Sequence, residues 1–213
     1  MKSEREFNCQ KIGDSCLLFV FFDRISIEHS RFILSLFRSL KSERDFLDLV
    51  PAYCDLAVHF NPQIISSQEL TVIVRKHIEN LSLELEAKVK LHKFPVIYDG
   101  EDLERVAQLT KLHRNEVIAR HVAAEYTVAM IGFLPDFPYL IGLDESLHVP
   151  RLENPRAKVP AGSVAIGGEQ TGIYPCNSPG GWNLIGRMDN EGLKLLEPGD
   201  KVKFFEVEHE DQL

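Results

Sequence analysis

A set of polar and aromatic side chains able to bind a small polar molecule occurs between residues 156 and 187. Amide, hydroxyl and aromatic groups together suit recognition of a lactam or a carboxylate, and glycines let a ligand approach the backbone closely. A tight Gly-Gly turn with a packed indole is an equally good interpretation of the same residues. The candidate substrate-binding residues are Arg156, Gln170, Thr171, Tyr174, Ser178, Gly180, Gly181 and Trp182.

The charge of this region favours an anionic small ligand. The chain carries a formal net charge of -8, yet residues 146–187 hold an excess of basic side chains, with Arg151, Arg156, Lys158 and Arg187 against Glu153 and Glu169. Nucleic-acid binding requires clustered Lys and Arg to neutralise phosphates, and no such cluster is present. We therefore expect a small-molecule substrate and no nucleic-acid partner.

Two further residue types could take part in chemistry. His121, on a predicted helix, is a candidate acid–base group, with a packed or capping histidine as the alternative. The four cysteines form no C-x-x-C pair and have no histidines at zinc-like spacing, so we expect reduced thiols and no metal. Cys176 lies near the candidate site, but no base can be assigned to it. No catalytic residue is identified from the sequence.

Several common signatures are absent, which narrows the chemistry. There is no G-x-x-x-x-G-K-[ST] phosphate loop, no G-x-S-x-G serine elbow and no Met-Lys-Met-like biotin site. We therefore expect no ATP, biotin or other cofactor to be bound by this chain alone. The longest apolar run, Cys16–Phe22, has seven residues, against the roughly 20 that a spanning helix needs. With no signal-peptide pattern either, a cytoplasmic location without membrane insertion is expected.

The first half of the chain predicts a small α+β domain. Apolar periodicity indicates a strand at Cys16–Phe22, a helix around Phe32–Leu40 and paired strands at Phe46–Ala52 and Leu56–Phe60. A capping box, Ser66-x-x-Glu69, starts a second helix, and Val89–Ile97 supplies a last strand. The order strand-helix-strand-strand-helix-strand predicts a ferredoxin-like domain over residues 1–94.

The second half of the chain has a different sequence pattern. Two short helical stretches, Glu101–Leu109 and Asn115–Ala124, are followed from Thr127 onward by strand-like runs interrupted by many glycines and prolines. This punctuation is typical of a compact β-barrel with functional loops. We therefore predict a β-barrel domain over residues 95–213, and an α+β fold class for the whole chain.

Ordered blocks of residues from about Leu17 to Val207 resemble the B-subunit family of 5-oxoprolinase, whose members are also called Kip inhibitor or allophanate hydrolase subunit 1. Its Gln-Thr-Gly-Ile-Tyr-Pro and Ser-Pro-Gly-Gly-Trp blocks are the most specific. The matching blocks are Val50–Tyr53, Val58–Pro62, Gly132–Leu140, Val159–Val164, Gln170–Pro175, Ser178–Trp182, Leu184–Arg187 and Pro198–Asp200.

The resemblance implies a ferredoxin-like N-terminal domain followed by a cyclophilin-like β-barrel. It also implies an obligate complex with the A and C subunits of 5-oxoprolinase, of which C is a related cyclophilin-like chain. Together they hydrolyse 5-oxo-L-proline to L-glutamate using ATP, which acts at the level of the complex, and this chain is inactive on its own. Two alternatives stay open: an inhibitor of a sensor histidine kinase, and a subunit of a biotin-dependent urea carboxylase or allophanate hydrolase-like carboxyltransferase.

The sequence departs from the family pattern at several positions. Asp136 stands where the family usually has glycine, and Asp tolerates positive φ better than most residues. The loop after Tyr98 is shortened to Asp99-Gly100-Glu101-Asp102, and Met188 replaces a common threonine. A divergent partner surface or an altered substrate would account for these differences.

Overall fold

The computed structural model describes residues 7–81 and 89–212, and the chain divides into two compact units, Met1–Lys88 and Val89–Leu213. Each unit has its own apolar core. None of the helices in the described ranges is long and apolar enough to cross a membrane.

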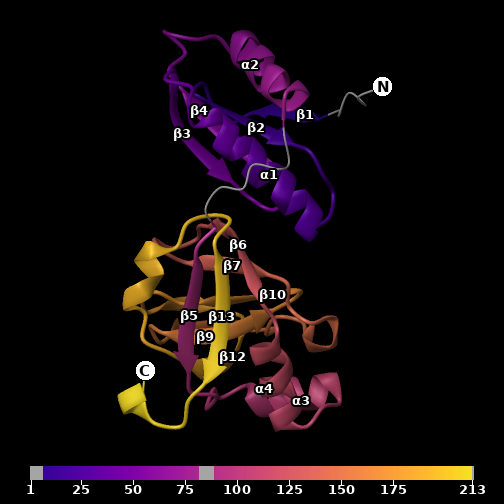
Figure 1. Cartoon of the computed structure of the whole chain (residues 1–213), viewed down its shortest axis with the longest axis vertical. Coiled ribbons are helices and arrows are strands. Elements are labelled where there is room, and N and C mark those ends of the chain that lie inside the picture. The colour runs from indigo at the N-terminus through magenta and orange to yellow at the C-terminus, as the bar shows by residue number, and fades with distance from the viewer. Residues whose placement is uncertain (1–6, 82–88, 213) are drawn as a thin grey trace. The chain divides into compact units, whose positions relative to one another are not determined.

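The N-terminal unit is a four-stranded antiparallel sheet in the order β1-β2-β4-β3, with two helices (Figure 1). Helix α1 packs against β3, β4 and α2. The element bounds are β1 Asn8–Lys11, β2 Cys16–Val20, α1 Ile27–Leu40, β3 Phe46–Pro51, β4 Asp55–Phe60 and α2 Ser67–Glu79.

Local sequence explains most of these elements. Strand β4 alternates buried and half-buried residues along its length, which suits a sheet with one covered face. Helix α2 begins with the predicted capping box, because Ser66 and Glu69 each bond the backbone amide of the other. Helix α1 is capped by Ser26, and eight of its residues are buried. These predictions are confirmed.

The last strand predicted for this unit forms, but its assignment to the N-terminal sheet is wrong. Strand β5, Leu91–Val96, pairs with the C-terminal strand of the other unit, so it does not complete the N-terminal sheet. The edge beside β2 is occupied instead by β1, Asn8–Lys11, which forms a hairpin with β2. The β2-α1-β3 unit with β4 inserted between its strands is the ferredoxin-like split β-α-β arrangement. Its fourth strand therefore comes from the N-terminal side of the chain.

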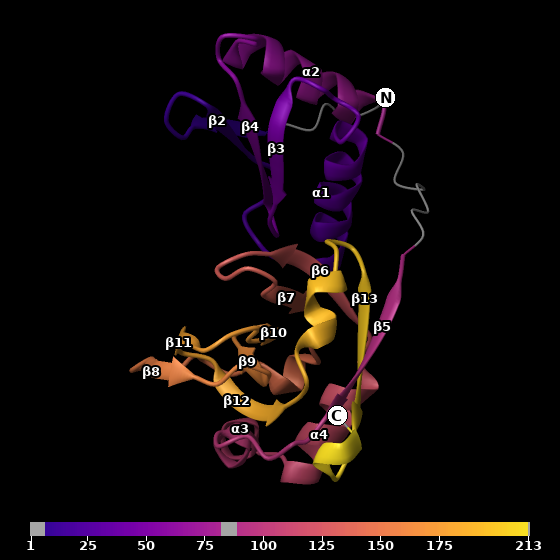
Figure 2. The ribbon, with the colours of Figure 1, turned by 90° about the vertical axis from the view of Figure 1, so that its left-hand side faces the viewer.

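Seven strands of the second unit form one sheet in the order β12-β9-β10-β7-β6-β13-β5. Neighbouring strands are antiparallel except β13 and β5, which run parallel (Figure 2). The bounds are β5 Leu91–Val96, β6 Tyr126–Ile131, β7 Pro138–Ile141, β9 Ser163–Gly167, β10 Gln170–Ile173, β12 Asn183–Arg187 and β13 Lys201–Glu206.

The two outer strands of this sheet meet and nearly close it into a barrel. Ile97, directly after β5, exchanges two backbone hydrogen bonds of 2.9 Å with Arg187 at the end of β12. A Cβ on Gly186 would lie 2.6 Å from the Ile97 carbonyl oxygen, so glycine is required at this seam. Closure leaves few unpaired strand edges.

Two helices and a small ribbon complete the second unit. Helix α3 packs on β12, and helix α4 packs on β13. Both helices form where the sequence predicted helical stretches. A two-stranded ribbon pairs β8 with β11. The remaining bounds are α3 Leu103–Thr110, α4 Arg114–Ala123, β8 Arg156–Val159, β11 Ser178–Gly180, and the short 3-10 helices η1 Glu145–Leu147, η2 Glu191–Leu195 and η3 Glu210–Gln212.

Candidate functional site

The sheet of the second unit has aromatic side chains on one face, separate from the main barrel core. Trp182 lies edge-to-face with Phe137 and Tyr139, at centroid distances of 5.8 and 5.7 Å. Phe137 also meets Tyr174 at 5.1 Å. We call these four residues the barrel aromatic cluster; Val159 of the ribbon, Ala165 and Leu184 pack with it.

Three glycines make room for these rings. A Cβ on Gly167 would lie 2.6 Å from the indole of Trp182, and one on Gly172 would lie 3.1 Å from it. A Cβ on Gly180 would collide with the Tyr174 hydroxyl. The sequence suggested that glycines here allow close approach of a ligand; these three admit aromatic side chains of the protein itself. Trp182 is 5% exposed and is part of the packed structure.

Two arginines border the cluster. The Arg151 guanidinium carbon lies 5.6 Å from the centre of the Trp182 ring, within cation–π range. Burial raises the pKa of Tyr139 and of Tyr174, and the charge of Arg151 opposes both shifts. Both phenols are therefore neutral donors at physiological pH, beside a cation.

Arg156 is held by the loop that differs from the family pattern. Its Nε lies 2.7 Å from Glu101, and its Nη2 donates to Asp102 at 2.7 Å. Asp102 is 6% exposed, and its other oxygen accepts from the backbone amide of Leu184. Asp99 of the same loop pairs with Arg187 at 2.8 Å. The shortened loop thus fixes two arginines through its carboxylates.

The remaining predicted ligand residues fall on two faces of β10 and on the ribbon. Because side chains alternate along a strand, Gln170 lies on the same face as Gly172, toward the aromatic cluster, and Thr171 faces the barrel core. Ser178 lies opposite Val159 in the ribbon, and its Oγ is buried without a hydrogen-bond partner in the described structure. A Cβ added to Gly181 would lie 3.5 Å from the side chain of Pro155.

His121 is linked to Thr171 inside the barrel core. His121 is 0% exposed; its Nδ1 lies 2.7 Å from the Tyr98 hydroxyl and its Nε2 lies 3.0 Å from Thr171 Oγ1. The Thr171 hydroxyl donates to the Ala165 carbonyl, so Oγ1 accepts from Nε2–H and Nδ1 accepts from Tyr98. Burial lowers the pKa of His121 to about 3, so the ring is neutral at physiological pH. Any proton it exchanges passes through one of two hydroxyls.

Most of the chain matches known proteins. The family described as carboxyltransferase domain, subdomain C and D, matches residues 7–194. The chain belongs to this family. The B subunit of 5-oxoprolinase from Bacillus subtilis is 33% identical over 96% of this chain and 95% of its own length. The Haemophilus influenzae protein of the same name is 39% identical over 84% of this chain and 88% of its own.

A solved structure supports the same fold for this carboxyltransferase-domain chain. The crystal structure of TTHA0988 superposes with a TM-score of 0.80 at 37% identity over 91% of this chain. The match spans 40% of that protein, so this chain corresponds to less than half of it. The α+β fold with a nearly closed barrel is thereby confirmed.

The loop before β7 carries backbone strain that the sequence only partly predicts. Asp136 has a φ of 64°, a backbone conformation that Asp tolerates better than most residues. Phe133 also has positive φ, at 70°, and is 64% exposed. Non-glycine residues in this region are uncommon and concentrate at functional loops. Phe133 carries no sequence signal for this geometry.

A Ser-His-Glu arrangement in the N-terminal unit was not anticipated. His77 Nδ1 lies 2.5 Å from Ser39 Oγ, and its Nε2 lies 2.8 Å from Glu43. The three side chains line a cavity of about 420 Å³. They lie at the C-terminal ends of α1 and α2, where carbonyls rather than amides are free, so the backbone offers no oxyanion hole. His77 is a half-buried residue that links the two helices through hydrogen bonds.

Metal and thiol chemistry find little support among residues 7–81 and 89–212. No group of three or more His, Cys, Asp or Glu side chains within these ranges is arranged to hold a metal ion. All four cysteines are free. Burial raises the pKa of the Cys9, Cys16 and Cys54 thiols, which disfavours their reactive thiolate form.

Proposed function

We propose that this chain is the B subunit of an ATP-dependent 5-oxoprolinase complex that converts 5-oxo-L-proline to L-glutamate. The observation that carries the proposal is similarity to two bacterial proteins of that name, at 33% identity over 96% of this chain and 39% identity over 84% of it. The A and C subunits, the latter related to this chain, complete the enzyme, which acts in the cytoplasm. The four free thiols suit that reducing compartment.

The reaction requires activation of an amide. Resonance makes the lactam carbonyl a poor electrophile, and ATP supplies the driving force by phosphorylating the lactam oxygen. Water then adds at that carbon and the C–N bond breaks, which frees the α-amino group and leaves the side chain as an acyl phosphate. A second water hydrolyses this acyl phosphate to the side-chain carboxylate of glutamate and inorganic phosphate. This chain has no phosphate loop, so nucleotide binding is assigned to the complex rather than to this chain.

Within this chain, we assign substrate binding to the ribbon and the adjacent aromatic face. Arg156 Nη1 and Ser178 Oγ are buried polar atoms without hydrogen-bond partners in the described residues. Such atoms are rare in folded proteins, and both lie on the β8–β11 ribbon. The carboxylate and the lactam carbonyl of 5-oxoproline can accept hydrogen bonds from Arg156 Nη1, Ser178 Oγ and the Gln170 amide. The lactam N–H can donate one in return.

The proposal is tested by reconstitution. The chain is co-expressed with its A and C partners, and glutamate formation from 5-oxoproline is measured with and without ATP. We expect ATP-dependent glutamate from the complex and none from the isolated chain. A complete, stable complex without this activity would overturn the proposal.

A substitution tests the site separately. Gln170→Ala is expected to leave assembly intact and to lower turnover about tenfold, the effect of losing one substrate hydrogen bond. Gln108→Ala, on an exposed position of α3, is the matched control and should have no effect. Loss of assembly with Gln170→Ala would instead assign this strand to an interface with another chain of the complex.

A second candidate function follows from the family description. A carboxyltransferase moves a carboxyl group from a biotinylated partner to an acceptor, and this chain has no biotin-accepting lysine motif of its own. Co-purification of a biotinylated protein, detected by streptavidin blotting, would favour this function. Absence of a biotinylated protein, together with ATP-dependent glutamate formation, would exclude the carboxyltransferase function.

A further inference from the structure

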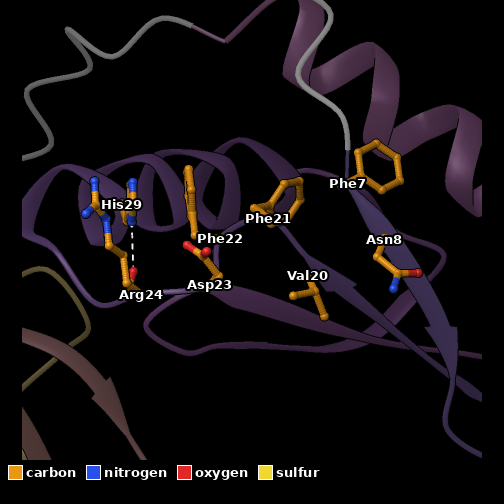
Figure 3. Close-up of a pocket in the computed structure, with 8 residues that line it drawn as sticks. All are labelled: Phe7, Asn8, Val20, Phe21, Phe22, Asp23, Arg24 and His29. Carbon is orange, nitrogen blue, oxygen red and sulfur yellow. Dashed lines mark hydrogen bonds between the residues drawn. The ribbon is translucent and has the colours of Figure 1, made fainter.

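An open cavity of about 780 Å³ lies in the N-terminal unit, and none of the residues assigned above lines it (Figure 3). The end of β2, the loop that follows it, the start of β1 and the first turns of α1 form its walls. Cavities of this size hold small organic molecules. The lining residues are Phe7, Asn8, Val20, Phe21, Phe22, Asp23, Arg24 and His29.

One side of this pocket is an aromatic surface. The Phe22 and His29 rings stack in parallel, with centroids 3.7 Å apart and an interplanar angle of 6°. Phe21 continues the surface, 6.4 Å from Phe22 and 5.6 Å from Phe7. All three phenylalanines are half-buried, so part of each side chain is exposed to solvent.

The polar end of the pocket has charges without partners. Neither the Asp23 carboxylate nor the Arg24 guanidinium has a hydrogen bond or ion pair with any side chain or backbone group among residues 7–81 and 89–212. In Figure 3 both lie at the end occupied by His29 and Phe22, far from Asn8. Neighbouring opposite charges that do not pair with each other are free to bind a ligand of matching charges.

The backbone under these charges is fixed. The Arg24 carbonyl accepts hydrogen bonds from His29 Nδ1 at 2.8 Å and from the Cys54 thiol at 3.0 Å. Phe21 and Phe22 donate their amides to the Cys54 carbonyl. Because a carbonyl oxygen can only accept, the proton of the bond between His29 and the Arg24 carbonyl is on His29 Nδ1. The site is therefore built before a ligand arrives.

We propose that this pocket binds a free α-amino acid with an apolar, preferably aromatic, side chain. Arg24 receives the α-carboxylate, for which its planar fork is suited, and Asp23 receives the α-ammonium group. The ligand side chain lies on the surface formed by Phe21, Phe22 and His29. A phosphorylated ligand fits poorly, because Asp23 and the net charge of -8 repel multiple negative charges.

The direct test is an NMR titration of the full-length, ¹⁵N-labelled chain with L-phenylalanine. We expect saturable shifts of the amides between Phe7 and Asn8, between Val20 and Arg24, and at His29, with a Kd on the order of 1 mM. The barrel amides should not shift. Absence of saturable shifts, or shifts confined to the barrel, would overturn the proposal.

Two analogues test zwitterion recognition. 3-Phenylpropionate lacks the ammonium group and phenethylamine lacks the carboxylate, and each should bind about tenfold more weakly than L-phenylalanine. If 3-phenylpropionate bound as tightly as L-phenylalanine, the role assigned to Asp23 would be wrong. Equally tight binding of phenethylamine would contradict the role assigned to Arg24. L-Alanine, which cannot cover the aromatic surface, should also bind more weakly.

Variants assign the contacts. Arg24→Ala and Asp23→Asn should each weaken L-phenylalanine binding about tenfold without changing the remaining spectrum. Arg31→Ala, which removes an exposed arginine of α1 outside the pocket, is the matched control and should bind normally. Unchanged affinity in Arg24→Ala, with an intact spectrum, would overturn the proposal whatever the outcome for the 5-oxoprolinase activity.

Discussion

The two arginine-containing sites of this molecule differ in how their charges are satisfied. In the barrel, Arg156 is tied to Asp102 and Glu101, and the aromatic rings beside it are packed onto glycines. In the N-terminal pocket, Arg24 and Asp23 have no partner in the described structure and the rings are half-exposed. Aromatic residues next to an arginine are therefore tightly packed in one unit and partly exposed in the other. The two sites differ in whether the arginine is paired with carboxylates.

The largest expected effect comes from Trp182→Ala, which removes the centre of the barrel aromatic cluster. The loss should be about 3–5 kcal/mol of unfolding free energy, because a buried aromatic ring leaves a cavity over Gly167 and Gly172. Urea unfolding followed by circular dichroism measures it. Phe133→Ala, at an exposed ring, should change stability by less than about 0.5 kcal/mol. Equal effects would contradict the assignment of Trp182 to the packed core.

Asp102→Asn should have the next largest effect. It leaves the Arg156 guanidinium without its buried counter-charge, at a cost of about 2–3 kcal/mol. Glu101→Gln removes the exposed partner of the same arginine and should cost less than about 1 kcal/mol. Differential scanning calorimetry of both variants provides the comparison. If Glu101 proved as important as Asp102, the buried pair would not be what fixes Arg156.

The pH dependence of barrel stability should report His121. Its folded pKa of about 3 lies below the unfolded value of about 6.5, so only the unfolded state gains a proton between these values. The stabilisation is complete above about pH 6.5 and is lost as pH falls toward 3, at up to about 1.4 kcal/mol per pH unit. Unfolding followed by Trp182 fluorescence should show a shallower slope in His121→Gln over this window. Identical slopes would show that the buried ring does not titrate on unfolding.

The smallest expected effect is that of Arg24→Ala on stability. A side chain without partners contributes little to folding, so the unfolding free energy should change by less than about 0.5 kcal/mol. Thermal unfolding of the variant beside Arg31→Ala checks this value. A loss above about 1 kcal/mol would give Arg24 a structural role and weaken the contrast with Arg156.

Local sequence patterns predicted the helices and strands better than they predicted which strands pair with one another. The Ser66–Glu69 capping box and the alternation of β4 depend on nearby residues, and both are confirmed. The partner of Leu91–Val96 is β13, near the other end of the second unit, and no local pattern specifies that pairing. Strand β1 has four exposed residues and therefore no apolar alternation to reveal it.

The candidate site was predictable only in part. Gln170, Tyr174 and Trp182 could be selected because they stand close together in sequence, and the fold places them on or beside one face of the sheet. Tyr139 and Arg151 come from separate segments, so only the fold brings them to Trp182. The pairing of Arg156 with Asp102 likewise joins residues far apart in the chain.

The parallel pairing of β5 with β13 has a consequence for the nascent chain. All four strands of the N-terminal sheet lie within residues 8–60, so that sheet can form while the ribosome is still translating the rest. Strand β5 emerges early but has to wait for β13, near the C-terminus, before its hydrogen bonds are made. Until β13 has been translated, the molecule carries one finished sheet and one strand without its partner. Completion of the barrel therefore waits for β13 to leave the ribosome.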